Sequence, residues 1–302
     1  MKFDYYSKLY LQFKEHELKP STYYKYKNIV SSRILPYFEN REIDTIKPSD
    51  IKMWLYDIND VGAKSKKHYI GVLSGIFQEA LYDDVISKNP VKQIRIPKYE
   101  KPVISPFTAD EVYTILNYAK NYNFKHYLAI AFYTGMRSGE IIALKKIDID
   151  FKRRLINVSR SRGIFGESTP KTKYSIREVP IIDSLLPYLK DICNYHDYEY
   201  LFINQYKKPY RDNNVFTYKF WKPSLEELNI EYRRPYNTRH TYATNMLYNQ
   251  LVSPVQLAQL LGHANTQMVY DVYVNYLDKQ FDNFDNSIVV YKWGVNKGLQ
   301  CF

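Results

Sequence analysis

The sequence predicts a mainly α fold with a small antiparallel sheet, an α+β protein organised as two domains. Apolar residues recur with the three- and four-residue spacing of helices along most of the 302 residues. The two-residue alternation that is typical of strands is confined to residues 147–181. Residues 96–107 combine three prolines with charged side chains and have no apolar periodicity. We therefore expect a linker there, between residues 1–95 and 108–302.

The first domain is expected to consist of helices. Helical periodicity runs over residues 21–38 and ends near Pro36. Pro48 suits the first turn of a second helix, because its missing N–H is not needed there. A third helix is expected to begin after Ser65, a favourable N-cap residue. Its apolar pairs repeat every four residues and give one buried stripe, which ends before Pro90.

The second domain is expected to open with a helix at Thr108, which can form a capping box with Glu111. A buried helix follows and ends at Gly135, and Ser138 can cap a short helix after it. Three strands of an antiparallel sheet are expected within residues 147–181. Further helices are expected near residues 183–194, 213–228, 237–250, 254–261 and 266–276.

The composition favours a polyanionic partner such as double-stranded DNA. The formal net charge is +11 and the sequence pI is about 9.2. A hydrophobic content of 45% excludes a disordered tail. Lys64, Lys66 and Lys67 stand at the start of the third expected helix, where they can contact DNA phosphates. A solvated helix face is the alternative interpretation of these lysines.

Cysteine usage and hydropathy suit a cytoplasmic protein. Cys193 and Cys301 lie far apart and belong to no cluster with metal-ligand spacing, which argues against a zinc site and a disulfide scaffold. No apolar run approaches the roughly 20 residues that span a bilayer. The N-terminal residues lack the apolar stretch of a signal peptide.

Four polar residues in the second domain form an ordered set. Arg137 follows Gly135, Arg239 precedes His240, and His263 follows the helix stop at Gly262. Tyr273 comes ten residues after His263. Arginine forks can hold the non-bridging oxygens of a phosphodiester, and a tyrosine hydroxyl can attack its phosphorus. The order of these residues therefore favours tyrosine attack on a DNA phosphate.

Tyr273 is the predicted nucleophile, although the chain has 32 tyrosines and this weakens any argument from one of them. Tyr270 and Tyr276 are rivals, since residues three apart share a helix face. Each arginine could also serve in backbone binding or a surface ion pair. Glu140, three residues after Arg137, could orient that arginine or a neighbouring histidine.

Together these motifs resemble the tyrosine recombinase family, also called phage integrases. The run from Met268 to Tyr273 resembles integrases of temperate phages and integrative elements. The resemblance covers nearly the whole chain and implies a core-binding domain in residues 1–95 and a catalytic domain in residues 108–302. It implies site-specific integration or excision of a mobile element through a 3′-phosphotyrosyl intermediate. It also implies a homo-tetramer on synapsed DNA without a metal or nucleotide cofactor.

The resemblance also implies residue roles. Lys171 is the expected general acid, with Lys173 as the alternative, and His263 is expected to bind a phosphate oxygen. One position departs from the family, because Tyr236 stands where many members have histidine, three residues before Arg239. The base that accepts the tyrosine proton is therefore open between the substrate phosphate, water and His263. His240 is interpreted as a structural residue of its helix.

Two other functions fit the same residues. A type IB topoisomerase uses a similar constellation without a tetramer, and a DNA-binding protein that has lost catalysis would fit Tyr236. The apolar segment from Phe281 to Trp293 is expected to dock, either on a neighbouring protomer or on its own domain. An additional N-terminal arm-binding domain is expected to be absent or to lie outside this sequence. Accessory bending or excision factors are possible partners.

Overall fold

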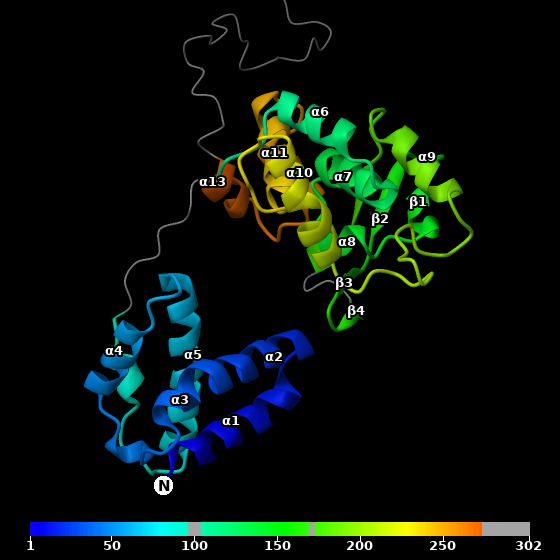
Figure 1. The fold of residues 1–302 in the computed structure, drawn as a ribbon. Coiled ribbons are helices and arrows are strands. Elements are labelled where there is room, and N and C mark those ends of the chain that lie inside the picture. The colour runs from blue at the N-terminus through cyan, green and yellow to red at the C-terminus, as the bar shows by residue number, and fades with distance from the viewer. Residues whose placement is uncertain (96–103, 169–172, 274–302) are drawn as a thin grey trace, which may run out of the picture. The chain divides into compact units, whose positions relative to one another are not determined.

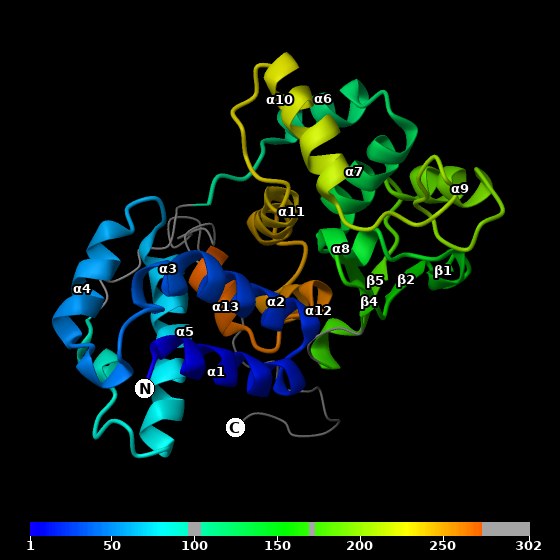
Figure 2. The same ribbon diagram turned by 60° about the horizontal axis from the view of Figure 1, so that its bottom comes forward.

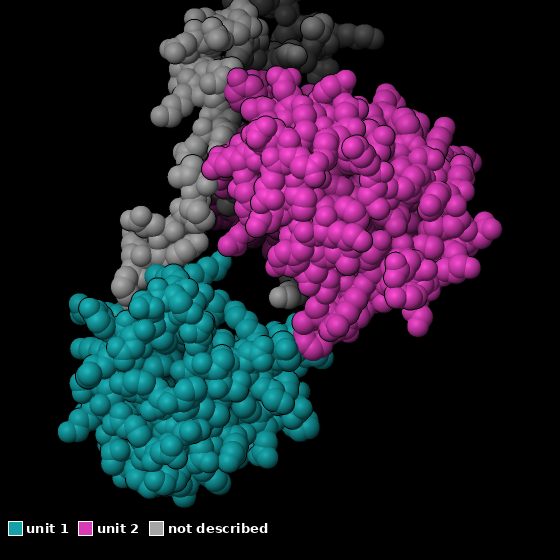
Figure 3. Space-filling view, in the orientation of Figure 1, with its two compact units in different colours: residues 1–103 teal, residues 104–302 magenta. Residues whose placement is uncertain are grey.

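The computed structural model describes residues 1–95, 104–168 and 173–273. The chain forms two compact units, residues 1–103 and residues 104–302 (Figure 3). Each unit has its own hydrophobic core. Within the described residues, no helix is both long enough and apolar enough to cross a membrane.

The first unit is helical throughout (Figure 1). Phe3, Tyr6 and Phe77 lie at the centre of its core, and α1 packs along α5. The regular elements of this unit are α1 (Phe3–Glu17), α2 (Pro20–Ile29), a π-helical segment (Val30–Ile34), α3 (Leu35–Phe38), a 3₁₀ turn (Ile43–Thr45), α4 (Pro48–Asp57), α5 (Ala63–Tyr82) and a second 3₁₀ turn (Pro90–Gln93).

Two features of the first unit differ from the sequence prediction. Helix α1 was not predicted, yet Phe3, Tyr6 and Tyr10 follow helical spacing and are buried. The prediction that Ser65 caps the third helix was wrong. Helix α5 begins at Ala63, and the Ser65 N–H already donates to the carbonyl of Gly62, so Ser65 lies inside the first turn.

A proline follows closely behind each of the two π-helical segments. Val30–Ile34 comes before Pro36, and Val215–Trp221 comes before Pro223. Proline has no N–H to donate and its ring clashes with the carbonyl one turn earlier. The wider π turn accommodates that clash, so the chain stays helical from α2 to Phe38.

The second unit surrounds α7 with helices and a small sheet (Figure 1). Its helices are α6 (Ala109–Tyr118), α7 (Tyr122–Thr134), α8 (Ser138–Ile141), α9 (Leu186–Asn194), α10 (Lys222–Glu227), α11 (Asn237–Tyr248), α12 (Pro254–Leu261) and α13 (Gln267–Tyr273). Its strands are β1 (Ile149–Asp150), β2 (Leu155–Val158), β3 (Ser161–Gly163), β4 (Gly166–Ser168) and β5 (Arg177–Pro180). Its 3₁₀ turns are Lys146–Asp148 and Lys173–Ser175.

The predicted three-stranded antiparallel sheet is confirmed, in the order β1-β2-β5. Ile156 pairs with Ile149 on one side and with Val179 on the other, so the buried side chains share one face. A second hairpin, β3-β4, was not predicted. Ile147, which was assigned to the first strand, lies in a 3₁₀ turn and is 85% exposed. The apolar alternation therefore began two residues before the strand itself.

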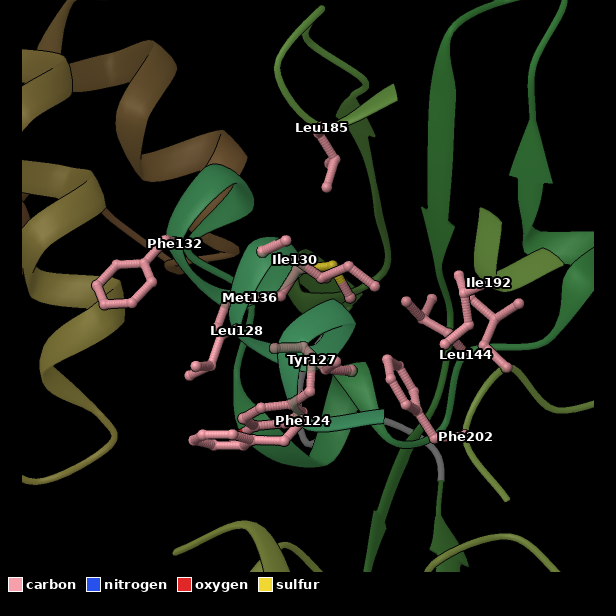
Figure 4. Close-up of a cluster of buried hydrophobic side chains, with 14 of the residues drawn as sticks. Phe124, Tyr127, Leu128, Ile130, Phe132, Met136, Leu144, Leu185, Ile192 and Phe202 are labelled. Atoms are coloured by element: carbon pink, nitrogen blue, oxygen red, sulfur yellow. The ribbon is translucent and has the colours of Figure 1, made fainter. Parts of the chain in front are cut away.

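Helix α7 forms the centre of the core (Figure 4). Its side chains pack on several sides, which explains why nine of its 13 residues are buried. Figure 4 shows Leu144, Ile192 and Phe202 packed together beside this helix. Phe107, at the end of the predicted linker, is 2% exposed and packs against Trp221. The second unit therefore begins before Thr108.

Candidate active site

Arg137 and Glu140 occupy the sharp junction between α7 and α8. Gly135 ends α7 in the left-handed conformation, with φ +62°, as the sequence predicts. Arg137 then forms the N-cap of α8, and its N–H donates to Glu140 Oε2 over 2.9 Å. The prediction that Ser138 is the cap was wrong, because Ser138 is already the first helical residue. The Arg137 side chain returns to the same carboxylate, with Nη1 2.8 Å from Glu140 Oε1.

Arg177 of β5 joins this pair from the sheet. Its Nη2 donates to Glu140 Oε2 over 2.9 Å and its Nη1 donates to Oε1 over 3.2 Å. Burial alone would raise the pKa of Glu140, but hydrogen bonds and charge from Arg177, and then from Arg137, hold it below its usual range. The carboxylate is therefore ionised and fixes two guanidinium groups.

Arg239 of α11 is 1% exposed and reaches the ends of two other helices. Its Nη1 donates to the carbonyl of Gly135 over 2.8 Å, and its Nη2 donates to the carbonyl of Leu261 over 2.6 Å. Helix C-termini carry partial negative charge, so this is a favourable place for a cation. These bonds fix the guanidinium between α7 and α12.

The arginine cluster has an excess of positive charge. The cluster contains three guanidinium groups, those of Arg137, Arg177 and Arg239. Its one carboxylate, Glu140, pairs with the first two, and no described carboxylate forms an ion pair with Arg239. Burial, joined by the charge of Arg137, lowers the pKa of Arg239 to about 10, so it stays charged at neutral pH. Arg137 keeps 35% of its side chain exposed. A partly open cluster of fixed cations is suited to bind an anion such as a phosphodiester.

His263 lies against Arg239 at the end of α12. Gly262 adopts φ +67°, and the His263 N–H donates to the carbonyl of Ala258 over 2.9 Å, which is a Schellman ending. His263 Nε2 is 3.0 Å from Arg239 Nη2, and Nδ1 is buried without a partner among the described residues. Burial, and then the charge of Arg239, lower the pKa of His263 to about 4. The ring is therefore neutral, with Nε2 accepting and Nδ1 carrying an unused proton.

Tyr273 of α13 lies beside these groups in the same unit. Helices α11, α12 and α13 lie next to one another (Figures 1 and 2), and Tyr273 is 2% exposed in the cluster that joins them. Its hydroxyl is 2.8 Å from Nδ1 of His240. The rival Tyr270 is 41% exposed, and Tyr276 lies outside the described residues. Burial raises the pKa of Tyr273.

Tyr236 stands at the start of α11 and is 49% exposed. Its ring meets the ring of His240 edge to face, with centroids 5.0 Å apart. Among the described residues, its hydroxyl has no hydrogen-bond partner. Tyr236 also lines a small cavity together with Arg239, so it lies at the edge of the site.

The structure does not show the remaining predicted residues in the arginine cluster. Lys171 and the apolar segment from Phe281 to Trp293 lie outside the described residues, and Lys173 belongs to the 3₁₀ turn before β5. Lys64, Lys66 and Lys67 stand within the first five residues of α5. The described residues contain no group of acidic, histidine or cysteine side chains that could hold a metal ion.

Sequence reasoning missed Arg177 and His240 as members of the site. Arg177 was not among the predicted site residues, and His240 was interpreted as structural. For His240 a signal existed, because it lies one helical turn after Tyr236 and so on the same face of α11. Arg177 lies on a strand, where nothing local indicates that its side chain reaches the α8 carboxylate.

Comparisons with known proteins agree with this arrangement. Residues 106–280 match the phage integrase family, and residues 2–58 match the phage integrase N-terminal SAM-like domain. A tyrosine recombinase XerC-like protein of Caldanaerobacter subterraneus subsp. tengcongensis is 31% identical over 88% of this chain and 76% of its own length. The transposase from transposon Tn916 of Enterococcus faecalis is 28% identical, over 78% of this chain and 64% of its own length.

Solved structures show the same fold. The Tn1549 transposon integrase in complex with a circular intermediate DNA superposes with a TM-score of 0.76 at 22% identity, over 89% of this chain and 94% of that one. A lambda integrase tetramer bound to a Holliday junction superposes with a TM-score of 0.74 at 21% identity, over 88% of this chain and 78% of that one.

Proposed function

The chain belongs to the phage integrase family of tyrosine recombinases, enzymes of site-specific DNA recombination, and we propose that Tyr273 is its nucleophile. The Tyr273 hydroxyl attacks a DNA phosphate, forms a 3′-phosphotyrosyl ester and releases the 5′ oxygen. The ester conserves the energy of the broken bond, so a second 5′ hydroxyl can reverse the step and rejoin the strand.

Arg137 and Arg239 hold the non-bridging oxygens of the attacked phosphate in this proposal. The transition state is more crowded and more negative than the phosphodiester, so fixed donors stabilise it more than the ground state. Glu140 keeps Arg137 in place through the hydrogen bonds to its N–H and guanidinium. The Nδ1 proton of His263 is a further donor, because it has no partner among the described residues.

Lys171 is the proposed general acid for the departing 5′ oxygen, with Lys173 as the alternative. An alkoxide is basic enough to take a proton from an ammonium group whose ordinary pKa is about 10.4. A substrate with a 5′-phosphorothiolate leaving group needs no such proton. It should rescue a Lys171→Ala variant, and failure to do so would remove Lys171 from this role.

Residues 1–95 are the proposed core-binding domain. A groove of about 420 Å³ between α2 and α5 is lined by Lys25, Arg33 and His68 among others. Burial, and then the charges of Lys25, Lys64 and Lys67, lower the pKa of His68, which indicates a concentration of positive charge. Phosphate backbones bind such surfaces.

The three lysines of α5 are expected to differ in their contribution. The ammonium of Lys66 donates to the carbonyl of Leu55 over 2.7 Å, so it ties α5 to α4. Lys67 is exposed and is proposed to contact phosphate, together with Lys64. Lys67→Ala should lower the slope of log affinity against log salt by about 1. Lys66→Ala should lower the free energy of unfolding of the unit, and it should change the salt slope less than Lys67→Ala does.

DNA is the partner of this enzyme class, and we propose that the active assembly is a homo-tetramer on two synapsed sites. The proposal is supported by the lambda integrase tetramer on a Holliday junction, whose fold this chain shares. Exchange of the apolar C-terminal segment between protomers would close such a ring. Accessory bending or excision factors remain proposed partners, and the proposed place of action is the nucleoid in the cytoplasm.

The proposal rests above all on one observation: Tyr273, rather than the exposed Tyr270, lies within the cluster of Arg239, His240 and His263. The test uses labelled duplex DNA from the region that flanks the gene. After denaturation in detergent, wild type should retain label on the protein, and Tyr273→Phe should retain none. Tyr270→Phe is the matched control and should form the adduct. An adduct that survives Tyr273→Phe would move the nucleophile to another tyrosine.

A further inference from the structure

His240 is the only described residue that forms a hydrogen bond with the Tyr273 hydroxyl. Its Nδ1 lies 2.8 Å from the tyrosine oxygen, and the ring centroids are 5.8 Å apart at an angle of 58°. Tyr273 is 2% exposed, so water does not replace this partner readily. The meaning of the contact rests on the proposed role of Tyr273 as nucleophile.

The direction of this hydrogen bond follows from which atoms are buried. If Nδ1 carried the proton, the buried Tyr273 O–H would have no acceptor among the described residues, which is a costly arrangement. If the tyrosine donates to Nδ1, the imidazole proton is on Nε2, which solvent reaches, since it is not among the buried atoms without a partner. The second arrangement satisfies every group, so the tyrosine O–H donates to Nδ1.

The other groups near the tyrosine are less suited to accept its proton. His263 uses Nε2 towards Arg239 and has its proton on Nδ1. Tyr236, at the position where many family members have histidine, is 49% exposed, and its hydroxyl forms no hydrogen bond with Tyr273 among the described residues. His240 follows Tyr236 by one helical turn, and so it can act from the same face of α11.

We propose that His240 is the general base that accepts the Tyr273 proton during strand cleavage, in place of a histidine at position 236. The Oη–H bond breaks and its proton passes to Nδ1 while the Oη–P bond forms. The P–O5′ bond breaks, and the 5′ oxygen takes a proton from the general acid proposed above. When the strand is rejoined, His240 returns its proton to the departing tyrosine oxygen.

The basicity of His240 is compatible with this role. Burial, and then the charge of Arg239, lower the pKa of His240 to about 4, so the ring is neutral and can accept at neutral pH. The phenolic O–H group becomes more acidic as its oxygen bonds to phosphorus, so the base need not deprotonate free tyrosine. A bound phosphodiester beside Arg239 also raises the pKa of His240 by placing negative charge nearby. The other titratable groups around the ring are Tyr236, His263 and Tyr273.

The decisive variant is His240→Asn. The asparagine oxygen can occupy the place of Nδ1 and still accept the hydrogen bond, but it cannot take the proton. Adduct formation on the labelled flanking DNA should slow by about 100-fold or more. Retardation of the same DNA in a gel should be unchanged. Cleavage by His240→Asn at close to the wild-type rate would overturn the proposal and leave His240 a positioning residue at most.

Chemical rescue separates proton transfer from packing. The His240→Ala variant leaves a space at the tyrosine, and added imidazoles should restore cleavage, with rates that rise with the pKa of the imidazole. Restoration independent of that pKa would contradict a general base. The 5′-phosphorothiolate substrate should not rescue His240→Asn, because it replaces only the general acid. Rescue of His240→Asn by this substrate would instead indicate that His240 protonates the leaving 5′ oxygen.

A measurement without DNA tests the geometry independently of activity. In full-length protein labelled with ¹⁵N-histidine, the His240 signal, identified by its loss in His240→Asn, should show an unprotonated Nδ1 at neutral pH. It should shift in Tyr273→Phe. A protonated Nδ1 would overturn the inference whatever the DNA assay gives. If wild type forms no adduct, the proposed function fails; if it does and His240→Asn is unaffected, only this inference fails.

Discussion

Removal of the Glu140 charge should destabilise the second unit more than any other single change at the arginine cluster. Glu140→Gln keeps the shape of the side chain but places an NH₂ group against guanidinium donors. Glu140 is 3% exposed and accepts two hydrogen bonds from Arg177, whose side chain is 6% exposed. Loss of one partner of a buried ion pair costs about 3–5 kcal/mol, because the other charge is left buried and unpaired.

The chain provides a matched control on β5, where Glu178 follows Arg177. Arg153 and Glu178 also form a two-point ion pair, with N···O distances of 2.7 and 3.0 Å, but their side chains are 59% and 49% exposed. Glu178→Gln should therefore cost only about 0.2–1 kcal/mol. The difference between the two variants isolates the effect of burial from the effect of losing one carboxylate.

Urea unfolding measures the difference. Trp221 is buried in the second unit, so its fluorescence reports on that unit in a background where Trp54 and Trp293 are replaced by phenylalanine. Glu140→Gln should lower the unfolding free energy by about 3 kcal/mol more than Glu178→Gln. Equal losses would refute the argument that Glu140 compensates a buried charge. Because the pKa of Glu140 is held below its usual range, acid should cause the same loss as pH falls through its folded value.

Three further outcomes are expected. Gly262→Ala should lower the free energy of unfolding by about 1–2 kcal/mol, because φ is +67° and the new Cβ would lie 3.1 Å from Arg177 Nη1. Gly71→Ala, which adds a Cβ in open space within α5, should instead raise it by about 0.5–1 kcal/mol, as measured by urea unfolding. Because the pKa of His263 is near 4 when folded and about 6.5 when unfolded, the unfolding free energy should fall as pH drops across that interval; an equal slope in His263→Asn would contradict this. Tyr236→Phe should cleave DNA nearly as wild type does, whereas Tyr236→His should restore part of the cleavage lost in His240→Asn; a large loss in Tyr236→Phe would assign its hydroxyl a role.

Local patterns in the sequence correctly predicted several features that depend only on residues close together in the chain. The capping box of Thr108 and Glu111 forms as expected, with hydrogen bonds of 2.8 and 3.1 Å. Gly135 and Gly262 end their helices in the left-handed conformation. These outcomes depend on hydrogen bonds between residues within about one turn of each other, so the sequence contains the whole interaction.

The same patterns failed where burial depended on distant partners. Helix α1 was overlooked because its buried positions are partly tyrosines, and their packing partners come from α2, α3 and α5. Tyr270 and Tyr273 share a helix face by spacing, so only the packing of α13 on α11 and α12 distinguishes the exposed residue from the buried one.

By itself the sequence determined the two-part organisation, the helix ends at Gly135 and Gly262, and the order of the two arginines, the histidine and the tyrosine of the site along the chain. Tertiary structure alone decided what each of them contacts. Arg239 bonds to a carbonyl 104 residues away, Glu140 to an arginine 37 residues away, and His240 to a tyrosine 33 residues away. Such contacts form when separate helices and strands bury a common core, and no local periodicity encodes which polar side chains meet at its edge.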